Sequence, residues 1–222
     1  MTRGVFITGT DTGVGKTAFA CALLRAYVAG GLRAVGMKPI ASGIEPGTAC
    51  NADVAALEAA GNVDAPLGLR NPFAFAPAIA PHLAAAEAGV TIDLARVREA
   101  YELLSARADR IVVEGAGGVY VPLDARRDML DVARALTLPV VLVVGIRLGC
   151  FNHALLSAHA IRARGLALAG WVANLLDPAM ARIDANVTTL DARLPAPRIA
   201  TLGWGKADAP VWGPGAGVLG IG

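Results

Sequence analysis

A glycine-rich segment near the N-terminus carries residue types that can bind phosphate. The apolar residues 4–8 lead into residues 9–17, with the sequence GTDTGVGKT, and a stretch rich in alanine and leucine follows. Phosphate binding needs inward-pointing backbone N–H groups, a helix N-terminus and no obstructing side chain. The glycines permit this turn, Lys16 can neutralise phosphate oxygens, and the Thr17 hydroxyl can bind Mg²⁺. The segment predicts a P-loop, although Thr10 stands where the motif usually begins with glycine. The expected nucleotide contacts are Gly13, Val14, Gly15, Lys16, Thr17 and Ala18.

An acidic residue at the end of another apolar run can complete a magnesium site. Residues 111–113 are Ile-Val-Val, Glu114 follows them, and glycines come next. Because glycine has no side chain, these positions suit a ligand that passes close to the backbone, and a loose turn after a strand is the alternative. We expect Glu114 to bind Mg²⁺ and the residues after it to lie near the nucleotide. Those residues are Gly115, Ala116 and Gly117.

Asp53 and Lys38 are two further candidates for the same site. Asp53 falls in the first turn of a predicted helix, where an aspartate can be a magnesium ligand or only a helix cap. Lys38 lies near the end of a second predicted strand. This places an ammonium group at the carboxyl edge of the sheet, beside the P-loop, where open α/β sheets bind ligands. A lone surface lysine is the alternative, but the position at a strand end favours a functional role.

The elements that would position these residues alternate between short apolar runs and longer helical stretches. Several runs are continuously apolar, which is typical of strands buried on both faces. Strands separated by helices indicate βαβ units. We therefore predict an α/β fold with a single doubly wound, mostly parallel sheet and helices on both faces, of the P-loop NTPase type. The predicted strands are residues 4–8, 34–39, 110–114, 140–145, 169–173 and 198–202. The predicted helices are residues 15–29, 52–60, 93–108, 129–136, 152–164 and 178–194.

Length, composition and charge restrict the class of protein. The chain has 222 residues, of which 55% are hydrophobic and 17% charged, so a disordered chain and a coiled coil are excluded. We expect one domain over residues 1–208 and a glycine-rich tail over residues 209–222, for which the pattern predicts no structure. The formal net charge is +2, and lysine and arginine form no run longer than two residues. This pattern argues against a nucleic-acid partner.

Four prolines between residues 61 and 89 interrupt both helical and strand patterns. We predict that this segment is a long loop over the carboxyl edge of the sheet. Loops of this length in a compact domain are usually functional.

The cysteines and the hydrophobic runs indicate a cytoplasmic protein. Cys21, Cys50 and Cys150 show no metal-ligand spacing, so we expect reduced thiols. The longest strongly apolar run, residues 139–146, is far shorter than the roughly 20 residues of a spanning helix. The apolar run from residue 4 ends before Thr8, too soon to form the apolar region of a secretory signal. We expect no membrane partner.

Several short segments together resemble the dethiobiotin synthetase family. The likeness runs in order from the N-terminus to about Trp204. The P-loop marks only a superfamily, whereas the segments at 38–43 and 148–153 are far more specific. The matching segments are TGTDTGVGKT at 8–17, KPIASG at 38–43, NAD at 51–53, PH at 81–82, VEGAGG at 113–118, LGCFNH at 148–153 and GWVAN at 170–174.

The resemblance implies an ATP-dependent ligase of biotin biosynthesis. Such enzymes convert 7,8-diaminononanoate, CO₂ and ATP into dethiobiotin, ADP and phosphate, through a carbamate that ATP phosphorylates and that the second amine then attacks. By this likeness Lys38 and Lys16 are catalytic, and Ser42 binds the substrate. Because a carbamate oxygen is a weak nucleophile, positioning and charge neutralisation must supply most of the rate. The implied magnesium ligands are Thr17, Asp53 and Glu114.

The resemblance also implies a homodimer with active sites at its interface. In the family, the distal carboxylate of the substrate binds at a helix N-terminus of the partner subunit, which suits an anion. An asparagine contacts the adenine, and a loop after a later strand closes over it. The implied substrate contacts are Gly118, Gly149, Cys150 and Asn152, and the implied adenine-side contacts are Asn174, Leu175, Gly203, Trp204 and Gly205.

Two positions depart from the family pattern. Gly13 stands where some members carry glutamate, and Asn186 stands where a tyrosine commonly reaches the substrate carboxylate. Both departures bear on substrate affinity more than on the type of reaction. For Cys150 the alternative role is a reactive thiol, since helix N-termini lower thiol pKa values, but the sequence identifies no base partner.

Two other classes of P-loop protein are alternatives. Nucleotide-switch ATPases of the partitioning and septum-positioning type carry a lysine five positions before the P-loop lysine. Here that position is Asp11, and the chain has no basic amphipathic tail for membrane attachment. An ATP-dependent cobyrinate amidase would need a glutaminase domain, for which 222 residues leave no room.

Overall fold

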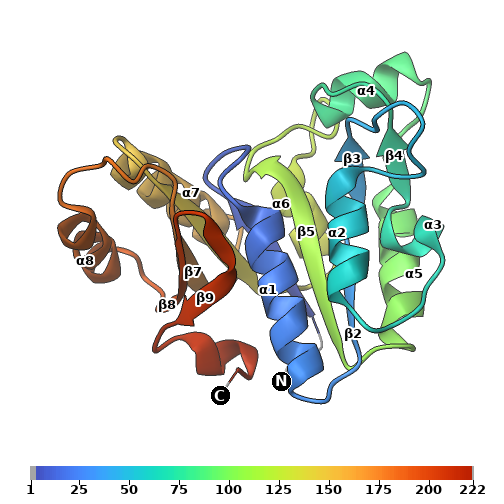
Figure 1. Ribbon diagram of the computed structural model, residues 1–222. Helices are drawn as coiled ribbons and strands as arrows, with labels where there is room; N and C mark the ends of the chain where they lie inside the picture. Colours follow the sequence, from blue (N-terminus) through green and yellow to red (C-terminus); the bar gives the residue numbers. More distant parts are fainter. Residues whose placement is uncertain (1–3, 222) are drawn as a thin grey trace.

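The computed structural model describes residues 4–221, except the side chains of residues 207 and 208, and contains a seven-stranded sheet with helices on both faces (Figure 1). The strand order is β2-β5-β1-β6-β7-β8-β9, and all neighbouring pairs are parallel except β8 and β9. The predicted mostly parallel α/β sheet is confirmed. The strands of this sheet are β1 (Gly4–Gly9), β2 (Ala34–Met37), β5 (Arg110–Gly118), β6 (Val140–Ile146), β7 (Leu168–Leu175), β8 (Arg198–Gly203) and β9 (Lys206–Trp212).

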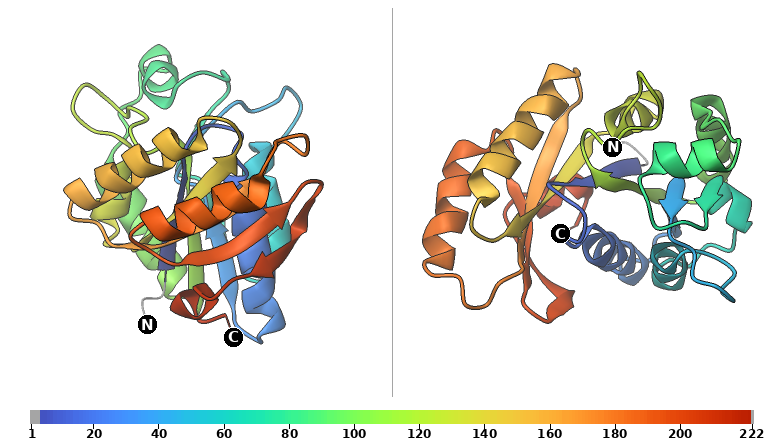
Figure 2. Two further views of the ribbon diagram at one scale, coloured as in Figure 1. Left: turned by 90° about the vertical axis from the view of Figure 1, so that its left-hand side faces the viewer. Right: turned by 90° about the horizontal axis from the view of Figure 1, so that it is seen from above.

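Strands β1, β2 and β6 are buried along their whole length, as their continuously apolar sequences predict. Every residue of β6 is buried. Val143 belongs to the core that α1 and α2 cover, whereas Leu142 and Val144 belong to the core on the other face, with α5 to α8. Figure 2 shows these two helical layers from above. The main helices are α1 (Lys16–Ala29), α2 (Ala52–Ala60), α5 (Leu94–Ser105), α6 (Met129–Ala135), α7 (Cys150–Ala163) and α8 (Ile183–Arg193).

Every predicted strand and helix is present, and the largest error in a boundary concerns α8. The helix was expected from residue 178 but begins at Ile183. The Asp177 carboxylate accepts a hydrogen bond from the Ala179 N–H at 2.9 Å, which forms a turn instead of a helix. Arg182 has a left-handed backbone with φ 59°, so the helix cannot extend back through it.

The proline-rich segment between residues 61 and 89 contains short ordered elements, so its description as a long loop was wrong. These are α3 (Leu67–Arg70), β4 (Phe73–Phe75) and α4 (Pro81–Glu87). Strand β4 pairs with β3 (Ile40–Ser42) in a separate two-stranded parallel sheet, which lies beside the carboxyl edge of the main sheet (Figure 1). Three- and four-residue elements are too short to show periodicity, which explains why the sequence pattern did not reveal them.

The chain passes from the main sheet to this small sheet at Lys38 and Pro39. A residue that precedes proline is restricted to extended conformations, and Lys38 is held there by its neighbours. Its N–H donates to the Arg70 carbonyl at 2.8 Å. Its carbonyl accepts a hydrogen bond of 2.7 Å from the Asn71 amide, which also donates to Phe73 at 3.0 Å. Asn71 therefore joins the end of β2 to the start of β4 and fixes the backbone of Lys38.

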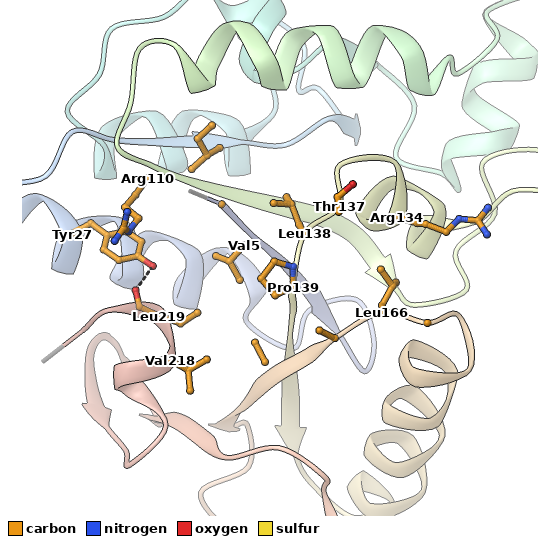
Figure 3. A pocket seen from close by; sticks show the side chains of 15 residues that line it. Val5, Tyr27, Arg110, Arg134, Thr137, Leu138, Pro139, Leu166, Val218 and Leu219 are labelled. Carbon is orange, nitrogen blue, oxygen red and sulfur yellow. Dashed lines mark hydrogen bonds between the residues drawn. The ribbon is translucent and has the colours of Figure 1, made fainter. Parts of the chain in front are cut away.

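The C-terminal residues complete the sheet instead of forming a separate tail. Strand β9 crosses the expected boundary between residues 208 and 209, and the 3-10 helix η1 (Ala216–Leu219) follows it. Residues 1–3 and 222 of the expected domain and tail lie outside the described residues. Figure 3 shows the Tyr27 hydroxyl donating to the Leu219 carbonyl, at 2.9 Å, beside a cavity of about 500 Å³ at the amino edge of the sheet. Burial raises the pKa of Tyr27 to about 12, although Arg110 opposes this shift.

We predict that Tyr27→Phe lowers the free energy of unfolding by about 1–2 kcal/mol, because the buried Leu219 carbonyl loses its partner. Urea denaturation measures this change. Tyr120→Phe is the matched control, because Tyr120 is 56% exposed, and we expect a change within about 0.5 kcal/mol. Equal stability of the two variants would mean that η1 gains nothing from this hydrogen bond.

Candidate active site

The turn between β1 and α1 has the backbone of a phosphate-binding loop. Gly13 and Gly15 adopt left-handed conformations, with φ 75° and φ 92°, which other residues rarely tolerate. A Cβ atom at Gly13 would have no heavy atom within 4 Å among the described residues, so the turn faces open space. Gly15 is the N-cap residue of α1 and has no side chain that could bond to the first-turn N–H groups. Helix geometry leaves the first-turn N–H groups free, and together with the helix dipole they favour an anion.

Lys16 begins α1 and lies across this turn. Its Nζ donates to the Asp11 carbonyl at 3.0 Å, and the residue is only 6% exposed. Burial lowers the pKa of Lys16, and the nearby Lys38 lowers it further, while Glu114 raises it. The ammonium group is therefore held in a position that suits phosphate oxygens.

The Lys38 ammonium group contacts two carboxylates that come from different elements. Its Nζ lies 2.6 Å from Oε1 of Glu114, at the carboxyl half of β5, and 2.6 Å from Oδ2 of Asp53 in α2. The Thr17 hydroxyl donates to the same Oε1 of Glu114 at 2.9 Å. Residues from α1, α2, β5 and the β2–β3 connection thus meet at one point. The sequence predicted these side chains for one site, and the structure brings them together.

Burial and charge shift the pKa values of this cluster in opposite directions. Burial lowers the pKa of Lys38, but Glu114 and Asp53 outweigh it, so its pKa is raised. Burial raises the pKa of the fully buried Glu114, and the Lys38 charge only partly offsets this shift. Burial also acts to raise the pKa of Asp53, but the Lys38 charge and hydrogen bond prevail and lower it. Lys38 is therefore held as a cation.

Asp53 does not cap α2, although an aspartate at this position often does. The cap is Asn51, whose side-chain oxygen accepts a hydrogen bond from the Asp53 N–H at 3.0 Å. The Asn51 amide nitrogen donates to the carbonyls of Ser42 at 3.0 Å and Gly43 at 2.9 Å. Asn51 therefore fixes the end of β3 against the start of α2 and leaves the Asp53 carboxylate free to face Lys38.

These groups line a cavity of about 840 Å³ at the carboxyl edge of the sheet. Residues from the turn, from α1, β3, α2 and β5, and from the 78–81 segment contribute to its wall. Ser42 contributes a buried hydroxyl that has no hydrogen-bond partner among the described residues. The predicted site residues that line the cavity are Gly13, Gly15, Lys16, Thr17, Ala18, Lys38, Ser42, Asp53, Glu114, Ala116 and Gly117.

The cavity also contains residues that the sequence did not indicate. Thr12 and Val121 line it, as do the residues from Ala78 to Pro81 that lead into α4. The proline-rich pattern correctly directed attention to the 61–89 segment as part of the site, but it could not identify which side chains reach the cavity. Pro81 belongs to the PH segment at 81–82 that resembles the family pattern, but the sequence assigned it no contact with the cavity.

Other predicted site residues lie outside this cavity wall. Gly115 packs against the core, where an added Cβ atom would lie 2.8 Å from the Phe6 ring. The side chain of Asn174, in β7, donates to the Val14 carbonyl of the turn at 2.8 Å. Trp204 is 59% exposed in the β8–β9 turn. The remaining predicted residues outside the wall are Val14, Gly118, Gly149, Cys150, Asn152, Leu175, Gly203 and Gly205.

The N-terminus of α7 lies beside the P-loop turn. Arg147, just before the helix, forms an ion pair of 2.7 Å with Asp11. Gly149 precedes the helix with a left-handed φ of 93°. Cys150 is a free thiol but only 2% exposed, whereas Asn152 is exposed. Burial of Cys150 argues against a role as a reactive nucleophile.

The chemistry of three oxygen groups fits a magnesium ion. The Oε2 atom of Glu114 is buried and has no hydrogen-bond partner among the described residues, so it can accept a cation. Thr17 and Asp53 supply further hard oxygen donors nearby. No group of three or more His, Cys, Asp or Glu side chains in the described chain could hold a metal by itself. This agrees with magnesium sites that use one or two carboxylates together with substrate phosphates.

The parallel sheet, the left-handed glycine turn and the lysine at the start of α1 define a P-loop nucleotide-binding protein. A family model described as an AAA domain matches residues 3–207. The septum site-determining protein MinD of Pyrococcus horikoshii, solved with Mg-ADP, has a TM-score of 0.57 and 15% identity, over 91% of this chain and 82% of that one. At this identity the likeness shows the fold alone.

Two curated relatives identify the family. An ATP-dependent dethiobiotin synthetase of Aromatoleum aromaticum is 53% identical over 202 residues, or 90% of each chain. Another, of Pseudomonas aeruginosa, is 56% identical over 195 residues, or 86% of each chain. The chain belongs to the ATP-dependent dethiobiotin synthetase family, and it is an ATP-dependent ligase. The expected family is confirmed, and the distant likeness to MinD does not outweigh it. No helix among the described residues is long and apolar enough to cross a bilayer.

We predict that Lys38→Met raises the pKa of Asp53, because the cation that lowers it is removed. Nuclear magnetic resonance titration of the ¹³C-labelled carboxyl group measures the shift. The variant should also lose on the order of 3 kcal/mol of stability near neutral pH, because two carboxylates then share a largely buried site.

The pH dependence separates this effect from a loss of packing. Carboxyl groups whose folded pKa is raised above the unfolded value of about 4 lower stability as the pH rises above that value. The deficit of Lys38→Met should therefore be small near pH 4 and grow toward pH 7. Arg33→Met, which breaks the exposed ion pair with Asp109, is the control and should show a much weaker pH dependence. A deficit that does not change with pH would contradict the ionic role of Lys38.

Proposed function

We propose that this protein converts 7,8-diaminononanoate, CO₂ and ATP into dethiobiotin, ADP and phosphate in biotin biosynthesis. The observation that carries the proposal is the Lys38 ammonium group, held at 2.6 Å from both Glu114 and Asp53 in the cavity that begins at the P-loop. A P-loop alone serves many nucleotide reactions, so the additional cation must account for the particular chemistry. The sequence relatives named above supply the identity of the substrates.

The P-loop would bind the phosphates of ATP through backbone N–H groups. Residues 13–18 supply these groups, and the left-handed glycines leave the approach open. Lys16 would move from the Asp11 carbonyl to the phosphate oxygens, a short displacement for a side chain with several rotatable bonds. Its charge would then neutralise part of the transferring phosphoryl group.

A magnesium ion held by Thr17, Asp53 and Glu114 would offset the negative charge of the triphosphate. The fit rests on the unpaired Oε2 of Glu114 and on the oxygen donors around it. Lys38 can keep its contact with Oε1 of the same carboxylate, because the two oxygens are distinct.

Lys38 and Ser42 would bind the carbamate formed on one substrate amine. The raised pKa of Lys38 keeps its ammonium group charged, so it can stabilise the carbamate and the charge that develops as its oxygen attacks. The Ser42 hydroxyl is buried beside the cavity without a partner among the described residues, so it can donate to the same group. The second amine then closes the cyclic urea and expels phosphate.

The substrate carboxylate would bind at the N-terminus of α7 in a partner subunit. Gly149, Cys150 and Asn152 do not line the cavity of their own chain, which is consistent with a role across a homodimer interface. Two apolar side chains beside them, Leu148 and Leu156, are 94% and 61% exposed. Apolar exposure of this kind favours a protein interface. Gly118, which pairs with Gly9 at the end of β5, would contact the substrate from the same chain.

The base of ATP would lie between Asn174 and the β8–β9 turn. The side chain of Asn174 is beside the P-loop, and an asparagine amide can both donate to and accept from adenine. Leu175 follows it at the end of β7. The turn with Gly203, Trp204 and Gly205 would close over the base, and its exposed indole offers a surface for stacking.

The two departures from the family would alter substrate affinity. Gly13 supplies no side-chain carboxylate at its position, and the space around its left-handed backbone stays open. Asn186 is in α8, and its amide donates to the Arg182 carbonyl of the same segment at 2.8 Å. Its short side chain therefore bonds to the residue that precedes α8 and does not extend toward another subunit as a tyrosine would.

The reaction should depend on both the diamine and bicarbonate. We expect ADP release by the protein with ATP and Mg²⁺ to be negligible until both are added, because the phosphoryl acceptor forms only then. A coupled assay of ADP together with mass detection of dethiobiotin measures this dependence. ATP hydrolysis that ignores the diamine, but rises with DNA or lipid vesicles, would support the nucleotide-switch alternative instead.

A mixing experiment tests the shared site. Lys38→Ala should keep nucleotide binding but lose turnover by several orders of magnitude. Asn152→Asp should raise the KM for the diamine at least tenfold, because it places a carboxylate where the substrate carboxylate binds. In heterodimers of the two variants, one site combines Lys38 of one chain with Asn152 of the other and is intact.

Random pairing of equal amounts would restore about a quarter of the wild-type sites. Each variant mixed with itself is the control. If the mixture shows only the sum of the two separate activities, Lys38 and Asn152 do not serve the same site from different subunits.

A further inference from the structure

The peptide between Val14 and Gly15 is held by a side chain from a distant strand. The Nδ2 atom of Asn174, in β7, donates to the Val14 carbonyl at 2.8 Å, in a buried contact between residues 160 positions apart. Asn174 itself is 7% exposed. Breaking this hydrogen bond would leave a buried carbonyl without a partner, which is unfavourable. The bond therefore holds the turn to β7.

Val14 is also anchored through its side chain. The residue is 1% exposed. A Cβ atom at Gly9 would lie 2.6 Å from its Cγ2 atom, and one at Gly145 would lie 3.0 Å from its Cγ1 atom. Glycines near the ends of β1 and β6 thus leave space that the Val14 side chain fills, together with Leu176 at Gly145. This packing fixes the position of the residue, and the Asn174 amide fixes the orientation of its carbonyl.

The orientation of this carbonyl determines where the next N–H points. The peptide unit is planar and trans, so the Gly15 N–H lies opposite the Val14 carbonyl. Gly15 lines the active-site cavity, whereas Asn174 does not. A Cβ atom at Gly15 would lie only 2.1 Å from Nδ2 of Asn174, so glycine is required for this hydrogen bond to form. The hydrogen bond therefore directs a backbone donor toward the phosphate position.

The Asn174 amide retains further hydrogen-bonding capacity. An asparagine side chain has two N–H donors and one acceptor oxygen, and the Val14 carbonyl uses one donor. The remaining donor and the oxygen are available to a nucleobase. One side chain can therefore contact the base and hold the phosphate cradle at the same time.

We propose that Asn174 is a positioning residue for the P-loop, which couples recognition of the base to binding of the triphosphate. The inference rests on the proposed ATP site but concerns the phosphate half of it. A residue that served only the base would have no effect on a ligand without a base. An anchor of the Val14–Gly15 peptide would affect every ligand that binds the P-loop.

Inorganic tripolyphosphate with Mg²⁺ is the probe that separates these roles. By calorimetric titration, Asn174→Ala should bind tripolyphosphate about tenfold more weakly than the wild type, because the cradle is no longer held in its binding geometry. Trp204→Ala is the base-side control and should weaken ATP binding while leaving tripolyphosphate binding unchanged. Wild-type affinity of Asn174→Ala for tripolyphosphate, with weakened affinity for ATP, would overturn the proposal.

A second measurement distinguishes loss of the anchor from general unfolding. Hydrogen exchange of the Phe19 amide, which donates to the Gly15 carbonyl at 3.0 Å, should accelerate at least tenfold in Asn174→Ala, while the amides of β6 keep their protection. Asn174→Ser, whose shorter side chain cannot reach the Val14 carbonyl, should give the same pattern if the alanine variant folds poorly. Unchanged exchange of the Phe19 amide in both variants would also overturn the proposal.

The outcome is independent of the catalytic assignment. If the wild type failed to form dethiobiotin, the proposed reaction would be lost, but the two tripolyphosphate affinities would still report on the anchor. Conversely, the wild type could form dethiobiotin normally while Asn174→Ala binds tripolyphosphate as tightly as the wild type. That result would reject the role of Asn174 as an anchor and leave the proposed reaction intact.

Discussion

The contact of one ammonium group with two carboxylates is the constraint that organises this molecule. Lys38 is buried, and Glu114 has no exposed surface, so neither charge is tolerable in the folded chain without the other. Satisfying both requires the end of β2, the carboxyl half of β5 and the start of α2 to meet within hydrogen-bond distance. The folded chain therefore brings the catalytic candidates together before any ligand contributes.

The second, smaller sheet forms because the chain leaves the main sheet at Lys38, directly after β2. Pro39 lacks an N–H, so it cannot continue the hydrogen-bond ladder of β2. The chain then turns into β3, and the Asn71 amide replaces the lost ladder by joining the carbonyls of Lys38 and Phe73. The same detour carries Ser42 to the cavity and allows the 61–89 segment to cover it. Pro39 thus helps to form the part of the cavity wall to which Ser42 belongs.

The sequence predicted the main sheet and the charged cluster because both depend on strong local signals. Continuous apolar runs identify buried strands, and Glu114 and Lys38 follow such runs directly. It did not reveal β3, β4 or α4, which are too short for periodicity and depend on contacts between distant segments. The role of Asn51 as the α2 cap was also missed, since Asp53 in the same turn gives an equally good capping signal. β9 was hidden because Pro210 lies within it, and a proline inside a run argues against a strand.

The residue at position 11 distinguishes this chain from the nucleotide-switch ATPases, which have the same type of fold. In the nucleotide-switch class this position carries a lysine that acts on phosphate, whereas here its side chain is an acceptor that pairs with Arg147 at 2.7 Å. Only its backbone carbonyl faces Lys16. The positive charge that such proteins place in the P-loop is found instead at Lys38, which lines the same cavity and pairs with Asp53 and Glu114. A cation there would lie near a phosphoryl acceptor that enters the cavity with the nucleotide. The relocated charge therefore favours transfer to a bound small molecule over a switch between nucleotide states.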